Sequence, residues 1–303
     1  MFDHTALHHA FLAVQENHGC AGVDRVTVDQ FAEGLTANLL ALRGELAGHR
    51  YRPLPLLRIQ VAKKNGEPRP LSIPAVRDRV VQTALLHRYQ PLLEREFESC
   101  SYAYRQGRSV RQAVHAIKEY HDQGYCWVVD ADIDAFFDTV DHELLMTRVA
   151  RFIPEPEGRR LIAQWLAAEV WDGTLATIRQ GLPQGSPLSP LLANLFLDEL
   201  DEAMLARGYR YLRYGDDYVV LCRSPREAHE AMALSAQVLD SLLLKLDEGE
   251  VVSFAQGFTY LGVTFMNGLM LTPYPLSTHK RRVLSYPPPF DLDGYLRRRH
   301  LEE

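Results

Sequence analysis

Residues 210–222 read RYLRYGDDYVVLC, and this stretch decides the fold. Two apolar runs flank a Gly-Asp-Asp turn, a pattern that predicts antiparallel strands at 209–214 and 218–223 joined by a tight hairpin. The turn alone needs no functional explanation, because Gly and Asp tolerate the backbone angles of turns. What the hairpin does establish is that Asp216 and Asp217 lie together at the tip of a buried pair of strands.

A second acidic strand precedes the hairpin. Residues 128–133 read VVDADI, so an apolar run ends in Asp130 and Asp132, the latter 84 residues before Asp216. Carboxylates at the mouth of a buried sheet repel one another and lose hydration unless a cation offsets both costs. Hard oxygen ligands of this kind are how proteins usually hold Mg²⁺. Each motif is weak by itself, and their combination predicts a metal-dependent site.

The rest of the chain alternates helical and extended patterns. Asn-Gly at the centre of residues 64–67 is a strong hairpin signal between two short strands. The predicted class is α+β, with mixed helices and an antiparallel sheet. Helices are expected at 4–17, 27–48, 75–97, 109–123, 141–151, 157–169, 187–206 and 226–244, and further strands at 55–61, 69–73, 125–133, 251–254, 258–265 and 269–272.

Composition narrows the class of protein. The 303 residues are 47% hydrophobic and 24% charged, which is ample material for a packed core. No apolar run is long enough to span a membrane, and the N-terminus lacks the features of a secretory signal. The four cysteines are scattered without metal-ligand spacing. We therefore expect a cytoplasmic protein without disulfides and without a membrane partner.

The charge is unevenly distributed. The formal net charge is −6, yet residues 43–111 hold 14 Lys/Arg against 6 Asp/Glu, an excess of eight. Further basic clusters lie at 280–282 and 297–299. Basic flanks around an acidic centre suit a protein that grips phosphates and concentrates metal ions, although ordinary solvated charge explains the same numbers.

Several motifs follow one another in the order found in reverse transcriptases of the group II intron type. The match runs from about residue 17 to about residue 265, and so many ordered motifs make an accidental likeness very improbable. The segments that carry this resemblance are NHGCAGVD (17–24), AKKNGEPRPL (62–71), DRVVQ (78–82), SYAYRQGRS (101–109), DIDAFFDTVDH (132–142), QGLPQGSPLSP (180–190) and YGDD (214–217).

The resemblance implies a two-metal-ion nucleotidyl transfer that extends a primer along an RNA template. Asp132 and Asp216 would bind two Mg²⁺ ions, for which Mn²⁺ can substitute, and Asp217 would support the same centre. The backbone carbonyl of Ile133 would complete the shell of one ion. Catalysis of this kind depends on positioning and electrostatics, and no nucleophilic side chain is needed.

The resemblance also implies a nucleotide pocket. Lys63 and Arg69 would contact the triphosphate of the incoming dNTP. The lysine ammonium provides a compact positive charge and the arginine guanidinium a forked set of donors, and both suit phosphate oxygens. Phe137 occupies the place of the sugar gate that excludes a ribose hydroxyl, while Gln184 and Gly185 would line the pocket. The alternatives are a solvated hairpin face for the two cations and an ordinary core position for Phe137.

Nucleic acid is the expected partner. The resemblance implies an RNA template and a DNA or RNA primer, and Arg105 and Arg108 lie in a polar loop from which they could hold template phosphates. A generic surface role is nearly as good an explanation for these two arginines.

The implied architecture is the polymerase right hand, with fingers, a palm built on an antiparallel sheet, and little or no thumb. The Asp132 strand and the Asp216 hairpin must then be adjacent in one sheet. The predicted division is an N-terminal helical extension at 1–49, fingers at 50–125, palm at 126–272, and a proline-rich, basic tail, linker or vestigial thumb at 273–303.

Two departures from the family bear on function. Residues 246–252 (LDEGEVV) lack the lysine that the family usually carries there, and few residues follow Tyr260 for a helical thumb. A short, thumb-poor enzyme resembles the reverse transcriptases of CRISPR adaptation modules, which suggests the CRISPR integrase complex as a partner. The alternatives are a truncated mobile group II intron reverse transcriptase, a weakly active nucleic-acid-binding scaffold, and an RNA-templated RNA polymerase, against which Phe137 speaks.

Overall fold

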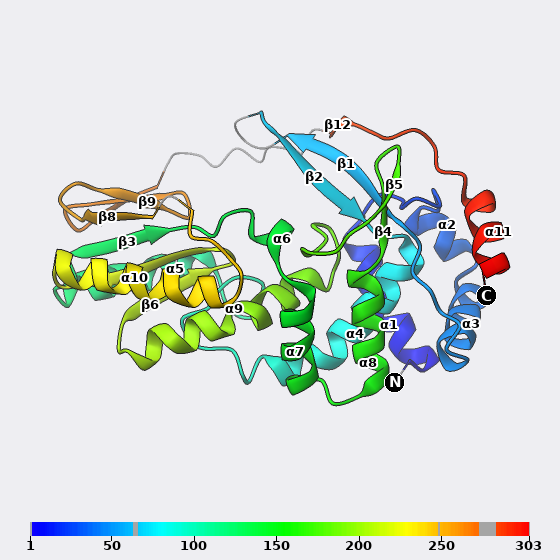
Figure 1. Ribbon diagram of the computed structural model, residues 1–303, viewed down its shortest axis with the longest axis horizontal. Coiled ribbons are helices and arrows are strands. Elements are labelled where there is room, and N and C mark those ends of the chain that lie inside the picture. The colour runs from blue at the N-terminus through cyan, green and yellow to red at the C-terminus, as the bar shows by residue number, and fades with distance from the viewer. Residues whose placement is uncertain (1, 63–65, 248, 273–282, 303) are drawn as a thin grey trace. The chain divides into compact units, whose positions relative to one another are not determined.

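A computed structural model describes residues 2–62, 66–247, 249–272 and 283–302 (Figure 1). The chain forms two compact units that interleave along the sequence. The first unit comprises Met1–Pro91, Val149–Ser189 and His279–Glu303, and the second comprises Leu92–Arg148 and Pro190–Thr278. The predicted domains follow one another instead, so the division into extension, fingers, palm and tail stays a prediction. Lys63 and the basic cluster at 280–282 lie outside the described residues.

The first unit combines helices with a mixed sheet. Two of its helices begin with side-chain caps: the Asp3 carboxylate accepts from the Ala6 N–H at 2.8 Å, and Thr27 forms a capping box with Gln30. The elements of this unit are α1 (His4–Glu16), α2 (Val28–Glu33), α3 (Leu35–Ala47), β1 (Leu56–Ala62), β2 (Pro68–Ile73), α4 (Val76–Leu93), α8 (Pro156–Leu166), β4 (Glu169–Trp171), β5 (Leu175–Thr177), β12 (Val283–Ser285) and α11 (Leu292–Glu302).

The sheet of the first unit is centred on β1. Strand β1 pairs antiparallel with β2 and β12 and parallel with β4, which in turn pairs with β5. Strand β12 gives residues 283–285 regular pairing within the stretch that was expected to be a tail, a linker or a vestigial thumb. Tyr295 of α11 is buried and its hydroxyl donates to Glu169 at 2.8 Å. These contacts are with residues far away in sequence, so the prolines nearby could not predict them.

The second unit holds the acidic motifs. The predicted hairpin and the strand before it are present, and the class is α+β as expected. The elements of this unit are α5 (Val110–Asp122), β3 (Trp127–Ala131), α6 (Phe136–Thr139), α7 (His142–Phe152), α9 (Ser189–Ala206), β6 (Arg210–Tyr214), β7 (Asp217–Cys222), α10 (Pro225–Ser241), β8 (Glu250–Ser253), β9 (Phe258–Tyr260), β10 (Val263–Met266) and β11 (Leu269–Leu271).

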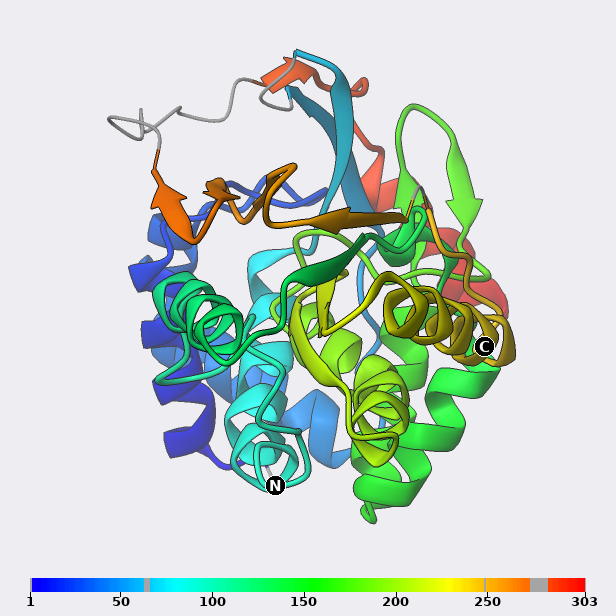
Figure 2. The same ribbon diagram turned by 90° about the vertical axis from the view of Figure 1, so that its left-hand side faces the viewer.

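Two antiparallel sheets organise the second unit. One has the strand order β6-β7-β3-β8 and the other β11-β10-β9. Helices α5 and α10 lie on the same side of the four-stranded sheet, where α10 packs on β3 and β7 and α5 on β6 (Figures 1 and 2). A buried cluster that includes Ile117, Val128 and Phe265 fills the space between these elements. The apolar side chains of the strands are thus buried in the core, and the acidic residues lie at the strand ends, outside this cluster.

Two predicted elements are interrupted. The helix expected at 27–48 is divided at Gly34 into α2 and α3, and Gly34 serves as the cap of both. The strand expected at 258–265 is divided into β9 and β10 by Leu261 and Gly262, whose φ angles are +51° and +78°. None of the helices in the described part of the chain is long and apolar enough to cross a membrane. The four cysteines are free thiols, of which Cys100 and Cys222 are buried.

Candidate active site

The acidic residues of the two motifs meet at one end of the four-stranded sheet. Strand β3 pairs antiparallel with β7, and Ala131 lies opposite Tyr218. Asp132 follows Ala131 at the end of β3, and Asp217 begins β7 beside it. The prediction that the Asp132 strand and the acidic hairpin are adjacent in one antiparallel sheet is therefore confirmed.

These carboxyl groups make ionisation costly for one another. Burial raises the pKa of Asp132, and the charge of Asp216 raises it further. Asp217 is exposed as a residue, yet loss of water around its carboxyl group and the charges of Asp132 and Asp216 raise its pKa to about 7. Burial and the neighbouring Glu250 raise the pKa of Asp130 to about 6. A cation placed among these groups would relieve the repulsion.

The backbone around Asp132 is held in place by the segment that follows α10. The Asp132 carbonyl accepts from the Asp247 N–H at 2.9 Å, and the Asp134 N–H donates to the Lys245 carbonyl at 2.9 Å. The Ile133 N–H donates to the Asp132 carboxylate at 2.8 Å. The Ile133 carbonyl, predicted as a metal ligand, accepts a long hydrogen bond of 3.4 Å from the Phe136 N–H.

The donor set suits a hard divalent cation that the protein shares with its substrate. Within the described ranges, no three His, Cys, Asp or Glu side chains are grouped so that they could hold a metal ion by themselves. Mg²⁺ is commonly held by one or two carboxylates, with water and substrate phosphates filling its other positions. Asp132, Asp216 and Asp217 fit this second arrangement, because their mutual repulsion favours a cation and their oxygens are hard ligands.

The two adjacent phenylalanines of the first motif have different surroundings. Phe136 is 1% exposed and belongs to the core, whereas Phe137 is only partly buried and meets Phe136 edge to face at 5.2 Å between ring centroids. An ordinary core role therefore describes Phe136 better than Phe137. The predicted gate residue is therefore the one of the two that is not fully buried.

In the first unit, three of the residues predicted to bind nucleotide lie together. The Arg69 Nε–H donates to the Gln184 side-chain oxygen at 2.6 Å, and the Ser72 N–H on β2 donates to the Gln184 carbonyl at 2.7 Å. Gly185 follows with a φ of +125°, and a Cβ there would be 2.6 Å from the Ser72 carbonyl oxygen. The glycine is thus required by the close approach of its own loop to β2. Arg69 is exposed.

The structure corrects the prediction for Arg105. Its side chain is 5% exposed, and its Nε–H donates to Glu94 at 2.7 Å. The rest of the guanidinium donates to the carbonyls of Phe97, Glu98 and Ser101. Arg105 closes its own loop and is not available to a template. Arg108 is only partly buried and stacks near the Tyr102 ring at 5.3 Å, so a template contact for Arg108 stays a prediction.

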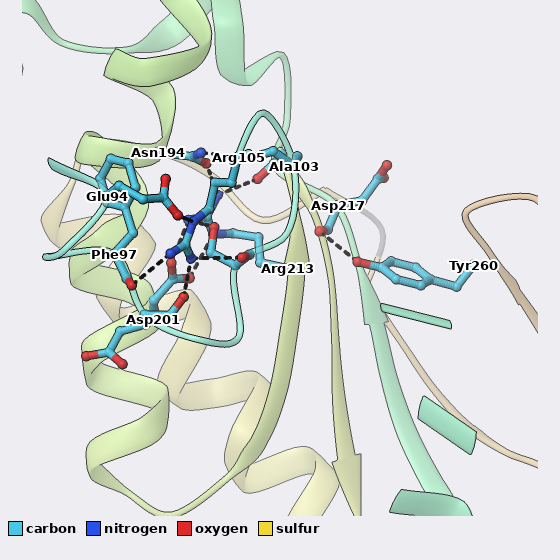
Figure 3. Close-up of polar contacts among 12 residues, drawn as sticks. Glu94, Phe97, Ala103, Arg105, Asn194, Asp201, Arg213, Asp217 and Tyr260 are labelled. Atoms are coloured by element: carbon cyan, nitrogen blue, oxygen red, sulfur yellow. Dashed lines mark hydrogen bonds and ion pairs between the residues drawn. The ribbon is translucent and has the colours of Figure 1, made fainter. Parts of the chain in front are cut away.

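One buried group near the acidic turn was not predicted. Arg213 on β6 is 1% exposed and forms an ion pair with Asp201 of α9, which is also buried (Figure 3). Its guanidinium also donates to the Gly215 carbonyl at 2.9 Å. On the other side of the turn, the buried Tyr260 hydroxyl donates to the Asp217 carbonyl at 3.1 Å. The second arginine of the strand RYLRY, which lies between Leu212 and Tyr214, was the available signal.

Comparison with known proteins gives concordant results. The profile of the family described as "Reverse transcriptase (RNA-dependent DNA polymerase)" matches residues 61–265. Protein YkfC of Escherichia coli (strain K12) is 33% identical over 283 residues, which cover 80% of this chain and 74% of that protein. Group II intron-encoded protein LtrA of Lactococcus lactis subsp. cremoris is 34% identical over 202 residues, 65% of this chain and 33% of that protein.

A solved structure is also similar. A chain of the "Partial Cas6-RT-Cas1--Cas2 complex" aligns with a TM-score of 0.48 and 29% identity, covering 78% of this chain and 40% of that chain. This chain therefore spans most of YkfC, but less than half of LtrA and of the matched chain in that complex.

Proposed function

Because the chain belongs to the reverse transcriptase family, as the match over residues 61–265 shows, we propose that it is an RNA-directed DNA polymerase whose acidic turn is the catalytic centre. The observation that carries this proposal is the meeting of Asp132, Asp216 and Asp217 at one end of the sheet, where burial and mutual repulsion raise the pKa of Asp132 and Asp217. A scaffold that only binds nucleic acid has no use for carboxylates held in this state.

The metal is proposed to be Mg²⁺, with two ions held between the three carboxylates and the nucleotide. When bound, such ions supply positive charge that favours the ionised primer hydroxyl and offsets charge on the departing pyrophosphate. The protein residues do the rest. The β3–β7 pairing keeps Asp132 and the acidic turn at a fixed spacing, and the hydrogen bond to Asp247 fixes the Asp132 carbonyl. Fixed placement of this kind is the main contribution of a polymerase to phosphoryl transfer.

Nucleotide binding is proposed for Arg69, Gln184 and Gly185, with Lys63 as a further phosphate contact. The hydrogen bond between Arg69 and Gln184 supports a common role, because a guanidinium fixed by an amide presents its remaining donors in one direction. Arg108 remains proposed for template binding. The expected partners are an RNA template, a DNA or RNA primer and dNTPs, in the cytoplasm.

The use of the cDNA is a further proposal. We propose that the cDNA serves the acquisition of CRISPR spacers from RNA, together with an integrase complex. The alternative is the truncated reverse transcriptase of a mobile group II intron. Co-purification of the tagged chain with an integrase from its native host distinguishes these proposals.

Primer extension tests the activity. The chain is incubated with poly-rA/oligo-dT and with a mixed-sequence RNA template, in Mg²⁺ and then in Mn²⁺. The matched control is Asp216→Asn, which keeps the size of the side chain and removes its charge. We expect metal-dependent DNA synthesis that falls at least a thousandfold in Asp216→Asn. Equal silence of both proteins, while both bind RNA, would favour the scaffold alternative.

The partly open ring of Phe137 supports the proposed discrimination against ribonucleotides. In Phe137→Ala, we expect incorporation of rNTPs to rise at least tenfold relative to dNTPs, because the ring no longer fills the space of a ribose hydroxyl. Phe136→Leu is the control, since Phe136 is buried in the core and its change should alter stability and not selectivity. Parallel extension with dNTPs and rNTPs measures the ratio, and an unchanged ratio in Phe137→Ala would remove the gate from the proposal.

A further inference from the structure

We infer that Arg213, fixed by Asp201, is a positioning residue that holds the backbone of the acidic turn and thereby places the Asp216 carboxylate. The inference rests on the proposed function, since Asp216 is the acid expected to bind metal. The inference adds Arg213 to the residues on which the catalytic centre depends. The Tyr-Gly-Asp-Asp motif does not explain why a charged side chain is buried three positions before Asp216.

The first step is the saturation of the Arg213 guanidinium. A guanidinium has five N–H donors. Two of the Arg213 donors reach the Asp201 carboxylate, at 2.7 and 2.5 Å. The others reach the Asn194 side-chain oxygen at 3.1 Å, the Ser101 hydroxyl at 3.0 Å and the Gly215 carbonyl at 2.9 Å. Every donor has a partner, so the group has one orientation.

The second step links this orientation to the turn. The Gly215 carbonyl belongs to the peptide that joins Gly215 to Asp216, and a peptide group is planar. A hydrogen bond that fixes its oxygen therefore also fixes the Asp216 nitrogen and Cα. Beyond Asp216, the Asp217 carbonyl is held by the Tyr260 hydroxyl at 3.1 Å. Figure 3 shows these anchors on the two sides of the turn.

The third step explains why the anchor is an ion pair. Both Arg213 and Asp201 are 1% exposed or less, so an unmatched charge at either position would be strongly unfavourable. Burial by itself lowers the pKa of Arg213, but the Asp201 carboxylate raises it above its usual value, and the guanidinium stays charged. Asp201 is thus the partner that allows a cation to sit under the turn. A lysine has a single ammonium group and cannot reach all five acceptors.

The chain provides a matched control. Arg105 is also a buried arginine of the second unit, with one carboxylate partner, Glu94, and three backbone carbonyls as acceptors. Its contacts hold the loop at 97–101 and include no atom of the acidic turn. Arg105→Lys therefore loses a comparable set of buried hydrogen bonds but keeps the bond from Arg213 to the Gly215 carbonyl; the two arginines share only Ser101, through its carbonyl and its hydroxyl respectively.

The experiment compares Arg213→Lys and Arg105→Lys with the wild-type chain. Thermal melting first identifies a temperature at which all three are folded. At that temperature, primer extension on poly-rA/oligo-dT gives kcat, KM for dTTP and the Mg²⁺ concentration for half-maximal rate. Amide hydrogen exchange of residues 214–218 then reports on the turn without requiring activity.

For Arg213→Lys, we expect kcat to fall tenfold to a hundredfold, as for a catalytic group displaced by about 1 Å, with KM for dTTP unchanged and the Mg²⁺ requirement increased severalfold. Exchange at residues 214–218 should be faster. Arg105→Lys should stay within threefold of wild type in kcat, with the turn equally protected. If Arg213→Lys does not fold, Ser101→Ala removes one guanidinium partner while keeping the ion pair, and a severalfold loss of kcat is expected.

Two results would overturn the inference. One is a folded Arg213→Lys with wild-type kcat, and the other is an equal loss of kcat in both lysine variants. If the wild-type chain makes no DNA, the proposed function fails, and hydrogen exchange decides the inference alone. Faster exchange of the turn only in Arg213→Lys would still support positioning, whereas equal exchange in both variants would refute it.

Discussion

The second unit holds two groups of carboxylates that differ in what lies beside them. Asp201 is buried against the Arg213 guanidinium, which donates to both of its oxygens. At the acidic turn, no ion pair to Asp132 or Asp217 is present in the described part of the chain, and burial and like charges raise their pKa values. The first group already has its counter-charge, whereas Asp132 and Asp217 have like charges beside them and no ion-pair partner among the described residues.

The difference teaches how one hairpin can be both rigid and reactive. A carboxylate paired with a fixed guanidinium makes the backbone around it rigid, because neither charge can move without leaving the other buried and unpaired. Carboxylates that crowd one another contribute affinity for a diffusible cation. Arg213 and Asp216 lie three residues apart, so the rigid group directly supports the reactive one.

The largest expected effect is at the paired carboxylate. Asp201→Asn keeps the shape of the side chain but leaves Arg213 buried without its counter-charge, so we expect the free energy of unfolding to fall by about 3–5 kcal/mol. Urea unfolding measures the change. The double variant Arg213→Met/Asp201→Leu removes both charges and should regain part of that stability, while DNA synthesis stays low because the Gly215 carbonyl has lost its anchor. A double variant as unstable as Asp201→Asn would contradict this account.

Asp198 provides a third case for the comparison. It lies one helical turn before Asp201 on α9, and no arginine forms an ion pair with it among the described residues. Asp198 is 1% exposed, and its Oδ1 has no hydrogen-bond partner among the described residues. Burial and the charges of Asp201 and Glu202 raise the pKa of Asp198 to about 7. Between about pH 4 and pH 7 the folded chain therefore holds a proton that the unfolded chain has lost, and stability falls as the pH rises through this range.

Asp198→Asn removes this titration. At pH 8 we expect the variant to exceed the wild type in free energy of unfolding by about 2–4 kcal/mol, at about 1.4 kcal/mol per unit of pKa shift. Near pH 3 the two proteins should be nearly equal, because that pH is below both the folded and the unfolded pKa and Asp198 is then mostly protonated in both states of the wild type. Urea unfolding at the two pH values measures the difference. A variant that gains nothing at pH 8 would show that Asp198 has a partner in solution.

The sequence was sufficient to predict one of these groups and insufficient for the other. The acids at 132, 216 and 217 follow apolar runs of strand length, and an antiparallel pairing of those runs had to bring them together. The Arg213–Asp201 pair joins a strand to a helix, and no periodic pattern links the two residues. Arg105 was misassigned for a related reason: a polar, glycine-containing loop suggests exposure, whereas the burial of its guanidinium depends on Glu94 and on carbonyls of the folded loop.

The same reasoning applies to the fold. The predicted helices and strands that depend on local periodicity are present, with ends shifted by a few residues and with the elements expected at 27–48 and 258–265 each divided in two. The strands that were missed, β4, β5 and β12, have three residues each and exist through their pairing within the sheet of the first unit. Short strands of this kind carry too little sequence pattern to be predicted, and the prolines before β12 favoured the opposite expectation.

The smallest expected effect concerns the second anchor of the turn. Tyr260 is 3% exposed, and Tyr260→Phe removes only the hydroxyl that donates to the Asp217 carbonyl. We expect a loss of about 1 kcal/mol in the free energy of unfolding. We also expect a severalfold fall in kcat, because the peptide after Asp217 becomes freer to move.

The control is Tyr218→Phe. Tyr218 lies on β7, next to the turn in sequence, and its buried hydroxyl donates to Ser235 of α10 at 2.9 Å. This substitution should cost a similar amount of stability and leave kcat within twofold of wild type. If both variants lower kcat equally, the rate depends on the overall stability of the sheet. If only Tyr260→Phe does, the backbone of the acidic turn must be held from both sides, since the Arg213 anchor would then be intact and yet insufficient.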